Sequence, residues 1–415
     1  MRGKVSEEDK NILRELAKKV AELAARPEME ERKRLWTEHN DLKLRRPLIL
    51  VFPEGSWQEL LPAASREVEE EGLWPVEREL KRRIYTAEHL GDDSVIVDEW
   101  PVTSVVRQVS GWGLEEKRVP SPEQRGAWHY EPVLHSAADV ARLRIPELYF
   151  DETATKARVE FFEELFGDIL KVRYKGVHHI TYHLMKQYTS WRGLEEMMMD
   201  IYCNPQLIHD VMEFLVEAHS RILEFYREHN LLRLNNDNTY QGSGGNGWTR
   251  SLPADDFSGV VRPQDMWSFA ESQELAQVGP EHHNQFALAY EKRLLAPFGL
   301  TAYGCCEDLS RKLDYVCTIP NLRRISISPW ADVEIAAAGL QDRYIFSWKP
   351  NPAHLVGRFD PEMIRSYIRH TLEVAKEHGC ILELVLKDTH TCDGEPERFS
   401  TWTRIAREEI TRVYG

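Results

Sequence analysis

The chain has 415 residues, of which 42% are hydrophobic and 29% are charged, and its formal net charge is −15 at pH 7. Non-specific binding to nucleic acid needs a positive surface that replaces phosphate counterions, so this charge argues against it. No apolar run is long enough to cross a bilayer, and the polar segment Met1–Asp9 lacks the apolar core of a secretory signal. We therefore expect a cytoplasmic protein, not bound to membranes, whose partners are small molecules or proteins.

Two helical patterns occupy the first 45 residues. Ser6 followed by acidic residues is typical of a helix start, and apolar residues at helical spacing continue to about Ala25. A second helical pattern extends from Met29 to Asn40. We expect residues 1–45 to form a helical extension that caps the main domain.

From Arg46 onward, short apolar runs alternate with helical patterns, ending in a helix over Arg398–Val413. Such alternation predicts parallel strands joined by helices, and eight strands is the number that closes a barrel. We expect an α/β fold, a (β/α)8 TIM barrel over residues 46–415, with a long insertion around 101–150. The eight predicted strands are 47–52, 94–97, 169–174, 231–234, 298–303, 322–327, 343–348 and 380–386.

Polar residues follow most of these runs. In a barrel the C-terminal ends of the strands converge on one open end, which carries the active site. Some of these residues are expected instead to form structural ion pairs or to cap helices. The candidate catalytic residues are Glu307, Glu99 and His178. The candidate substrate-binding residues are Glu54, His179, Asp237, Tyr240, Trp330, Lys349, Asn351 and Lys387.

Two cysteine-bearing segments suggest a metal site. The fifth run ends in Cys305-Cys306, and the eighth is followed by His390-x-Cys392. Thiolates and an imidazole suit a tetrahedral zinc ion that leaves one position open for substrate. The alternative is a buried pair of cysteines, with His390 bonded to Asp388.

Aromatic and glycine-rich segments also lie at or just past the strand ends. Aromatic side chains there suit a pocket for a flat, apolar substrate, although each one alone is more often part of the core. The glycine-rich segment 240–245 is not followed by Gly-Lys-Ser/Thr, so it is a mobile loop near the site and not a phosphate-binding loop. The aromatic residues are Trp100, Trp112, Tyr240, Trp248, Trp330 and Trp348.

Three longer segments and the fifth-strand cysteines carry a family resemblance. The segments are Leu134–Pro146, Gly193–Asp200 and Cys203–Val211. From about Leu134 onward, the chain resembles the uroporphyrinogen decarboxylase superfamily and, within it, the corrinoid-dependent methyltransferases. The resemblance implies a (β/α)8 barrel.

Two departures from the family pattern bear on activity. The decarboxylase itself carries an Arg-rich motif that grips tetrapyrrole carboxylates, and the corresponding segment Arg45–Glu54 lacks it. Related zinc methyltransferases use His-x-Cys at the fifth strand, where this chain has Tyr303-Gly-Cys305. His390 would have to replace the missing ligand. The departures favour relatives that demethylate small methoxylated or methylamine-type compounds.

The resemblance therefore implies a methyltransferase that takes a methyl group from a small methylated substrate, such as an aryl methyl ether, and passes it to a corrinoid. Zinc or a protonated side chain would stabilise the leaving oxygen. The chain has no Asp-x-His-x-x-Gly motif, so the corrinoid would be carried by a partner protein. The resemblance allows a homodimer, since relatives are often dimers, but the sequence does not fix the oligomeric state. The alternatives are a metal-independent decarboxylase or lyase of the same fold, with Lys349 or Lys387 holding a carboxylate, and a binding protein that has lost catalysis.

Overall fold

The computed structural model describes residues 5–122 and 128–415, so parts of the predicted extension (1–4) and insertion (123–127) lie outside the described residues. Its centre is a sheet of seven strands, and neighbouring strands in it are parallel. In sheet order the strands are β1 (Leu48–Val51), β13 (Ile381–Leu386), β12 (Ile345–Trp348), β11 (Leu322–Ile327), β10 (Leu300–Tyr303), β9 (Trp267–Ala270) and β8 (Thr181–Tyr182).

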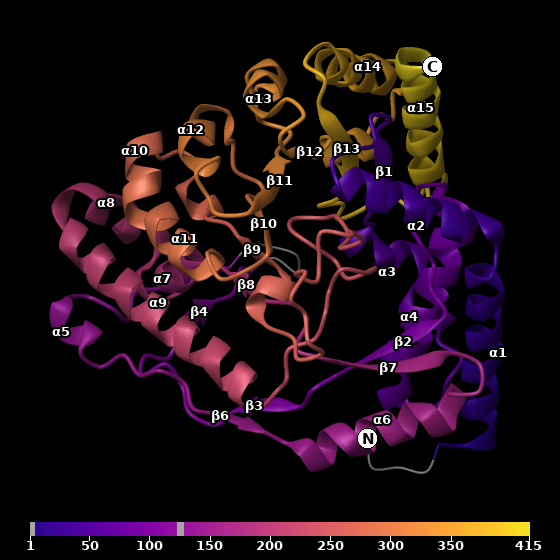
Figure 1. Ribbon diagram of the computed structural model, residues 1–415, viewed down its shortest axis with the longest axis horizontal. Helices are drawn as coiled ribbons and strands as arrows, with labels where there is room; N and C mark the ends of the chain where they lie inside the picture. Colours follow the sequence, from indigo (N-terminus) through magenta and orange to yellow (C-terminus); the bar gives the residue numbers. More distant parts are fainter. Residues whose placement is uncertain (1–4, 123–127) are drawn as a thin grey trace.

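Helices connect these strands and lie around the outside of the sheet (Figure 1). The longest have apolar faces at helical spacing, as in α14, where Ile364, Ile368, Leu372 and Ala375 are buried. The helices that follow the N-terminal extension are α3 (Trp57–Leu60), α4 (Trp74–Tyr85), α5 (Ala137–Val140), α6 (Glu152–Phe166), α7 (Leu184–Arg192), α8 (Leu194–Cys203), α9 (Pro205–Glu228), α10 (Pro280–His283), α11 (Ala289–Leu295), α12 (Leu313–Val316), α13 (Val333–Leu340), α14 (Pro361–Glu377) and α15 (Glu397–Tyr414).

The parallel α/β architecture is as predicted, but strand pairing does not close the sheet into a ring in the part of the chain described. Strand β1 pairs with β13 on one side only. On its other edge, the N–H groups of Ile49 and Val51 donate to the carboxylates of Asp93 and Asp92, at 2.8 and 2.9 Å. Two side chains, together with one backbone bond from the Asp93 N–H to the Ile49 carbonyl oxygen at 2.9 Å, therefore take the place of a neighbouring strand.

This substitution explains why the predicted strand at 94–97 is wrong. The residues after Asp93 have no strand edge to join, and the next strand, β2 (Glu99–Thr103), pairs instead with β7 (Lys171–Gly176). The predicted strand at 231–234 is reduced to one bridge between Leu232 and Val177. Strand β9 was not predicted because its four residues include a central serine and give too short an apolar run.

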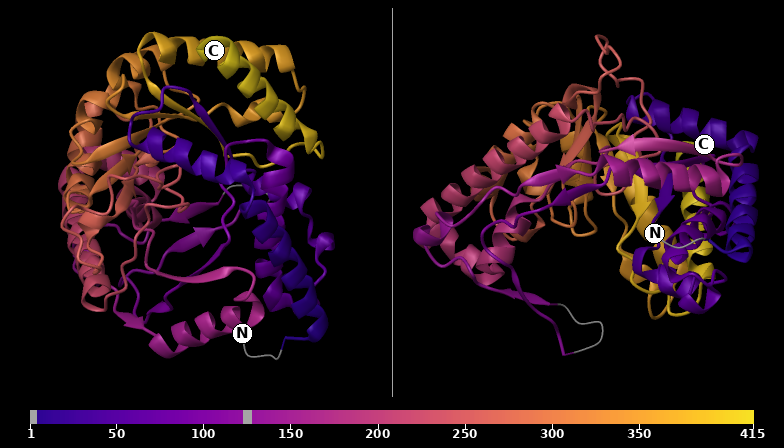
Figure 2. Two further views of the ribbon diagram at one scale, coloured as in Figure 1. Left: turned by 45° about the vertical axis from the view of Figure 1, so that its right-hand side comes forward. Right: turned by 90° about the horizontal axis from the view of Figure 1, so that it is seen from below.

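The predicted insertion forms small antiparallel pairs. Strand β3 (Val106–Gln108) pairs with β6 (Leu148–Phe150), and β4 (Lys117–Val119) pairs with β5 (His129–Glu131). The β4–β5 hairpin projects away from the rest of the chain in the right-hand view of Figure 2. It does not contribute to the central sheet.

The predicted N-terminal helices are confirmed as α1 (Glu7–Ala24) and α2 (Pro27–Asn40). The Ser6 hydroxyl caps α1 by accepting from the Asp9 N–H at 3.0 Å. Helix α1 packs against α4 and α6, away from the main sheet, whereas the C-terminal end of α2 enters the core. No helix among residues 5–122 and 128–415 has the length and apolar character needed to cross a membrane.

A buried ionic network joins α2 to the sheet. Arg324 on β11 donates from Nε to Glu383 Oε1 on β13 at 2.8 Å, and from a terminal nitrogen to the Asn40 side chain at 2.6 Å. His39 lies 3.1 Å from the other Glu383 oxygen. Asn40 in turn donates to the carbonyl oxygen of Asn246, at 3.1 Å. Two strands, one helix and one loop thus share a single pair of charges.

Glu383→Gln should destabilise the protein by about 3–5 kcal/mol, because it leaves Arg324 buried without a counter-charge. Although burial opposes it, Arg324 holds the pKa of Glu383 below its ordinary value, so the stabilisation is present at neutral pH and is lost only in strong acid. Urea unfolding at pH 7 measures the difference.

Glu217→Gln, which removes an exposed ion pair with Arg221 on α9, is the matched control and should change the free energy of unfolding by less than about 1 kcal/mol. Equal effects of the two substitutions would contradict the role given to Glu383.

Candidate functional site

The glycine-rich segment, predicted as a mobile loop, is buried inside the open end of the sheet. Residues 241–247 are all buried, and Tyr240 and Asn246 form an antiparallel bridge at its base. A Cβ on Gly244 would lie 2.6 Å from Val385 of β13, and one on Gly245 would lie 2.6 Å from Arg324 of β11. Glycine is required here because the loop backbone lies directly against the strands.

This loop brings Ser243 to the cysteines that follow β10. The Ser243 hydroxyl donates to Cys305 Sγ at 3.3 Å and accepts from Lys387 Nζ, also at 3.3 Å. Cys306 Sγ lies 3.4 Å from Cys305 Sγ and 3.6 Å from an Asp388 oxygen. We refer to Ser243, Cys305, Cys306, Lys387 and Asp388 as the thiol cluster.

The surroundings of Cys305 favour its thiolate. Hydrogen bonding from Cys306 lowers the pKa of Cys305 to about 6, and the Lys387 ammonium and the Ser243 hydroxyl contribute in the same direction against the effect of burial. Burial lowers the pKa of Lys387, but the Cys305 thiolate, Tyr240 and Asp388 outweigh it and raise that pKa. The cluster therefore holds a thiolate and an ammonium at neutral pH.

Two carboxylic acids adjoin the thiol cluster. Glu54, after β1, accepts from the Asp388 N–H at 2.9 Å, and burial raises its pKa. Glu307 is fully buried, accepts from the Cys305 N–H at 2.9 Å, and has one oxygen without a partner among the described residues. Burial, with the nearby charge of Glu271, raises the pKa of Glu307 to about 7. Glu307 can therefore exchange protons near neutral pH, and the pKa of Glu54 is shifted in the same direction.

Lys349 lies deeper than Lys387. Its ammonium is buried and donates to the carbonyl oxygen and hydroxyl of Ser347, at 3.1 and 2.6 Å. Burial lowers the pKa of Lys349 to about 7. Lys349 therefore belongs to the floor of the site, above the network of Glu383.

The predicted zinc ligands are not brought together as one set. Cys305 and Cys306 are adjacent, but Cys392 donates from Sγ to Glu59 on α3 at 3.1 Å. His390 is exposed and packs over Gly55, where an added Cβ would lie 3.3 Å from its Nδ1. Within the ranges described, no three His, Cys, Asp or Glu side chains are arranged to hold a metal ion. The geometry does not fit the predicted four-ligand zinc site.

A second group of predicted residues lines a pocket of about 680 Å³ next to the interrupted edge of β1. Phe52, after β1, packs edge-on against Tyr240 with ring centroids 5.3 Å apart, and both line this pocket. We refer to it as the β1–β2 pocket. The predicted site residues that line it are Glu99, His178, His179, Asp237 and Tyr240.

Within the pocket, several of these residues have structural partners. Glu99 was predicted to follow a strand, but it is the first residue of β2. Its carboxylate pairs with Arg173 at 3.3 Å. His178 Nδ1 lies 3.0 Å from the Lys175 carbonyl oxygen, and Asp237 pairs with the Lys175 ammonium. Tyr240 is the residue that borders both the pocket and the thiol cluster, since it lines the former and interacts electrostatically with Lys387 and Cys305.

Other predicted residues lie elsewhere. Trp330 is 70% exposed and does not line the pocket, while Asn351 caps the turn after β12 by accepting from the Ala353 N–H at 3.0 Å. Of the predicted aromatic set, only Tyr240 and Trp248 line the pocket. The other tryptophans, Trp100, Trp112 and Trp348, pack against aromatic side chains of the protein interior.

Three residues of these sites were missed. Ser243 could have been noticed as the hydroxyl-bearing residue of the glycine-rich segment, but nothing in the sequence indicates that this segment is buried. Glu59, which holds Cys392, and Arg82, which lines the pocket, lie on helical segments without a recognisable motif.

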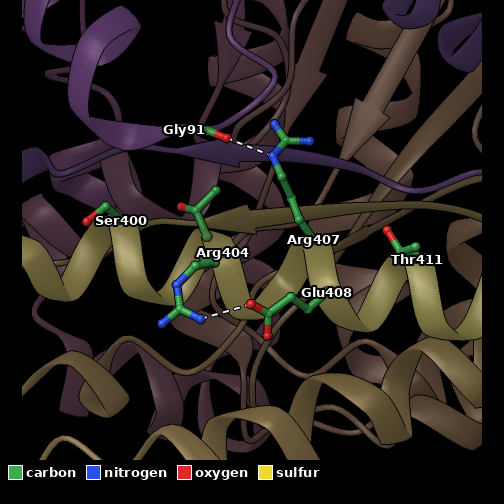
Figure 3. Close-up of a pocket in the computed structure, with 7 residues that line it drawn as sticks. Gly91, Ser400, Arg404, Arg407, Glu408 and Thr411 are labelled. Atoms are coloured by element: carbon green, nitrogen blue, oxygen red, sulfur yellow. Dashed lines mark hydrogen bonds and ion pairs between the residues drawn. The ribbon is translucent and has the colours of Figure 1, made fainter.

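A separate groove of about 550 Å³ runs along α15 (Figure 3). Its charged residues bind one another or the backbone: Arg404 pairs with Glu408 at 2.9 Å, and Arg407 donates to the Gly91 carbonyl oxygen at 2.8 Å. Arg407 also pairs with Asp93, one of the residues that cover the edge of β1. The groove therefore lies where α15 packs against the segment before β2, and its charged residues hold these two parts together.

No protein-family model matches the chain, and a search of curated proteins finds no significant match.

The rate of alkylation of Cys305 by iodoacetamide should reach half of its maximum near pH 6, because the reagent reacts with the thiolate. This midpoint lies well below the ordinary thiol pKa of 9.0. Lys387→Ala and Ser243→Ala should each raise this midpoint, since each removes a group that stabilises the thiolate. Peptide mass spectrometry across a pH series gives the rates.

The exposed Cys203 on α8 serves as an internal reference for the reagent. A Cys305 midpoint that stays unchanged in both variants would contradict the geometry described for the thiol cluster.

Proposed function

We propose that the protein is an enzyme that removes a methyl group from a small methylated substrate, such as an aryl methyl ether, and passes it to a corrinoid carried by a partner protein. The observation that carries the proposal is the Lys387 ammonium at the open end of the sheet, tied through Ser243 to Cys305. The family resemblance of the sequence supplies the reaction class, and the thiol cluster supplies a place for it.

The difficult part of ether demethylation is the negative charge that develops on the leaving oxygen. An ammonium has three donors. Lys387 uses two, toward Ser243 and Asp388, at 3.3 and 3.2 Å. The third has no partner among the described residues and can donate to a substrate oxygen, and a fixed cation in a partly buried site stabilises such an oxyanion strongly.

A proton must finally reach the leaving oxygen. Tyr240 borders both the pocket and Lys387, and burial raises its pKa, so its hydroxyl stays protonated at neutral pH. Glu54 and Glu307 lie on the other sides of the thiol cluster and titrate closer to neutrality. The site therefore offers both a hydrogen-bond donor for the transition state and acids that restore the proton afterwards.

Bound nearby, a reduced corrinoid supplies the nucleophile that takes the methyl group. The residues of this chain do not form a zinc site of the predicted composition, so the proposal assigns the stabilisation of the oxyanion to Lys387 instead of a metal. The Cys305 thiolate keeps Lys387 charged and fixes it in place through Ser243.

The alternative is a metal-independent decarboxylase or lyase. Its support is the presence of two lysines close enough to interact electrostatically, Lys387 and the buried Lys349. The pKa of about 7 of Lys349 allows it to hold or release a proton. In that case Lys387 would bind a substrate carboxylate instead of a leaving oxygen.

Incubation with cob(I)alamin and a panel of methoxylated aromatic compounds should produce methylcobalamin, followed by its absorbance. Lys387→Ala should lower the rate about 100-fold or more, the usual effect of removing one oxyanion-stabilising group, and Lys387→Arg should retain part of it. Cys203→Ala, at an exposed site on α8, is the control and should match the unmodified protein.

The decarboxylase alternative is favoured if carboxylated compounds release carbon dioxide without any corrinoid while methylcobalamin does not form. The methyl-transfer proposal fails in that case, and also if methylcobalamin forms at the same rate in Lys387→Ala.

A further inference from the structure

Five acidic residues and five lysines and arginines line the β1–β2 pocket, but their ion pairs are distributed so that two of the lining cations have no carboxylate partner. Apart from Glu30, which is exposed, each acidic residue lining it is paired with a cation. The pairs are Glu79 with Arg83, Asp98 with Lys171, Glu99 with Arg173, and Asp237 with Lys175. Among the described residues, the lining cations Arg82 and Lys33 make no ion pair.

Arg82 is the more informative of the two. Its guanidinium lies over the Trp57 ring, 5.3 Å from the centroid, and its Nε is buried without a hydrogen-bond partner in the described part of the chain. Burial and the neighbouring charge of Arg78 disfavour its cationic form, with only Glu79, already paired to Arg83, acting in its favour. The side chain of Arg82 as a whole is half-buried, but a buried donor without a partner is costly, and a bound anion would satisfy it.

The rest of the pocket provides flat, partly apolar walls. Lys33 lies 4.7 Å from the centroid of the Trp248 ring, and Phe52 packs against Tyr240. Tyr240 also separates the pocket from Lys387 and Cys305. A volume of about 680 Å³ is ample for a single substituted ring.

We propose that this pocket binds a small aromatic acid, with Arg82 as the main counter-ion of its carboxylate and Tyr240 beside its ring. One part of the inference rests on the proposed function, namely that the substrate of that reaction is a methoxylated aromatic acid whose ether oxygen lies toward Lys387. The binding of the acid stands on the charges of the pocket alone.

Isothermal titration calorimetry without any corrinoid tests this with 4-methoxybenzoate and its neutral isostere, 4-methoxybenzamide. The acid should bind at least tenfold more tightly than the amide. Arg82→Gln should weaken binding of the acid at least tenfold and leave binding of the amide unchanged, and Arg82→Lys should give an intermediate affinity because it keeps the charge but not the planar fork. Circular dichroism should show that both variants remain folded.

Arg78→Gln, on the same helix but outside the pocket lining, is the matched control and should not weaken binding of the acid. The inference is overturned if acid and amide bind equally, if neither binds, or if Arg82→Gln binds the acid as tightly as the unmodified protein. If acid binding depends on Arg82 while methylcobalamin never forms, the pocket inference stands and the proposed function fails. If methylcobalamin forms although acid binding ignores Arg82, only the pocket inference fails.

Discussion

The buried pair of Arg324 and Glu383 is the interaction on which the rest of the structure depends. Removing two charges from water costs several kcal/mol for each, and this cost is met only when the remaining hydrogen-bonding capacity is also satisfied. Here the end of α2 provides part of that satisfaction, since Asn40 binds Arg324 and His39 binds Glu383, while the other terminal nitrogen of Arg324 has no partner among the described residues. The N-terminal extension is therefore an integral part of the sheet interior, because without it both charges would be left incompletely bonded.

The same network supports the glycine-rich loop from below. Asn40 donates to Asn246, and Gly245 lies so close to the Arg324 guanidinium that no side chain fits between them. The loop then holds Ser243 between a cysteine from β10 and a lysine from β13, strands that are not neighbours in the sheet. In this placement the Lys387 ammonium lowers the pKa of Cys305, and the Cys305 thiolate raises the pKa of Lys387. Neither strand alone would produce these shifts.

The interruption of the sheet at β1 gives the protein its other distinctive feature. Asp92 and Asp93 satisfy the strand edge, so the chain before β2 is free to line a pocket instead of pairing. Arg407 on the last helix binds Asp93 and thereby joins α15 to the chain at this interruption. Tyr240 lines the pocket and is close enough to Lys387 and Cys305 of the thiol cluster to feel their charges. In the functions proposed above, substrate binding is assigned to the pocket and the chemistry to the thiol cluster, two neighbouring but separate groups of residues.

The sequence by itself determined the parallel α/β class, the two N-terminal helices, most strands of the central sheet and the juxtaposition of polar residues such as Cys305 and Lys387 with strand ends, since these follow from local periodicity. Only the tertiary structure decided that Glu59 holds Cys392 away from the other cysteines, that the glycine-rich loop is buried, and that side chains replace a strand beside β1. These features depend on contacts between residues as much as 333 positions apart, and no local pattern encodes which distant carboxylate or backbone group satisfies a given donor.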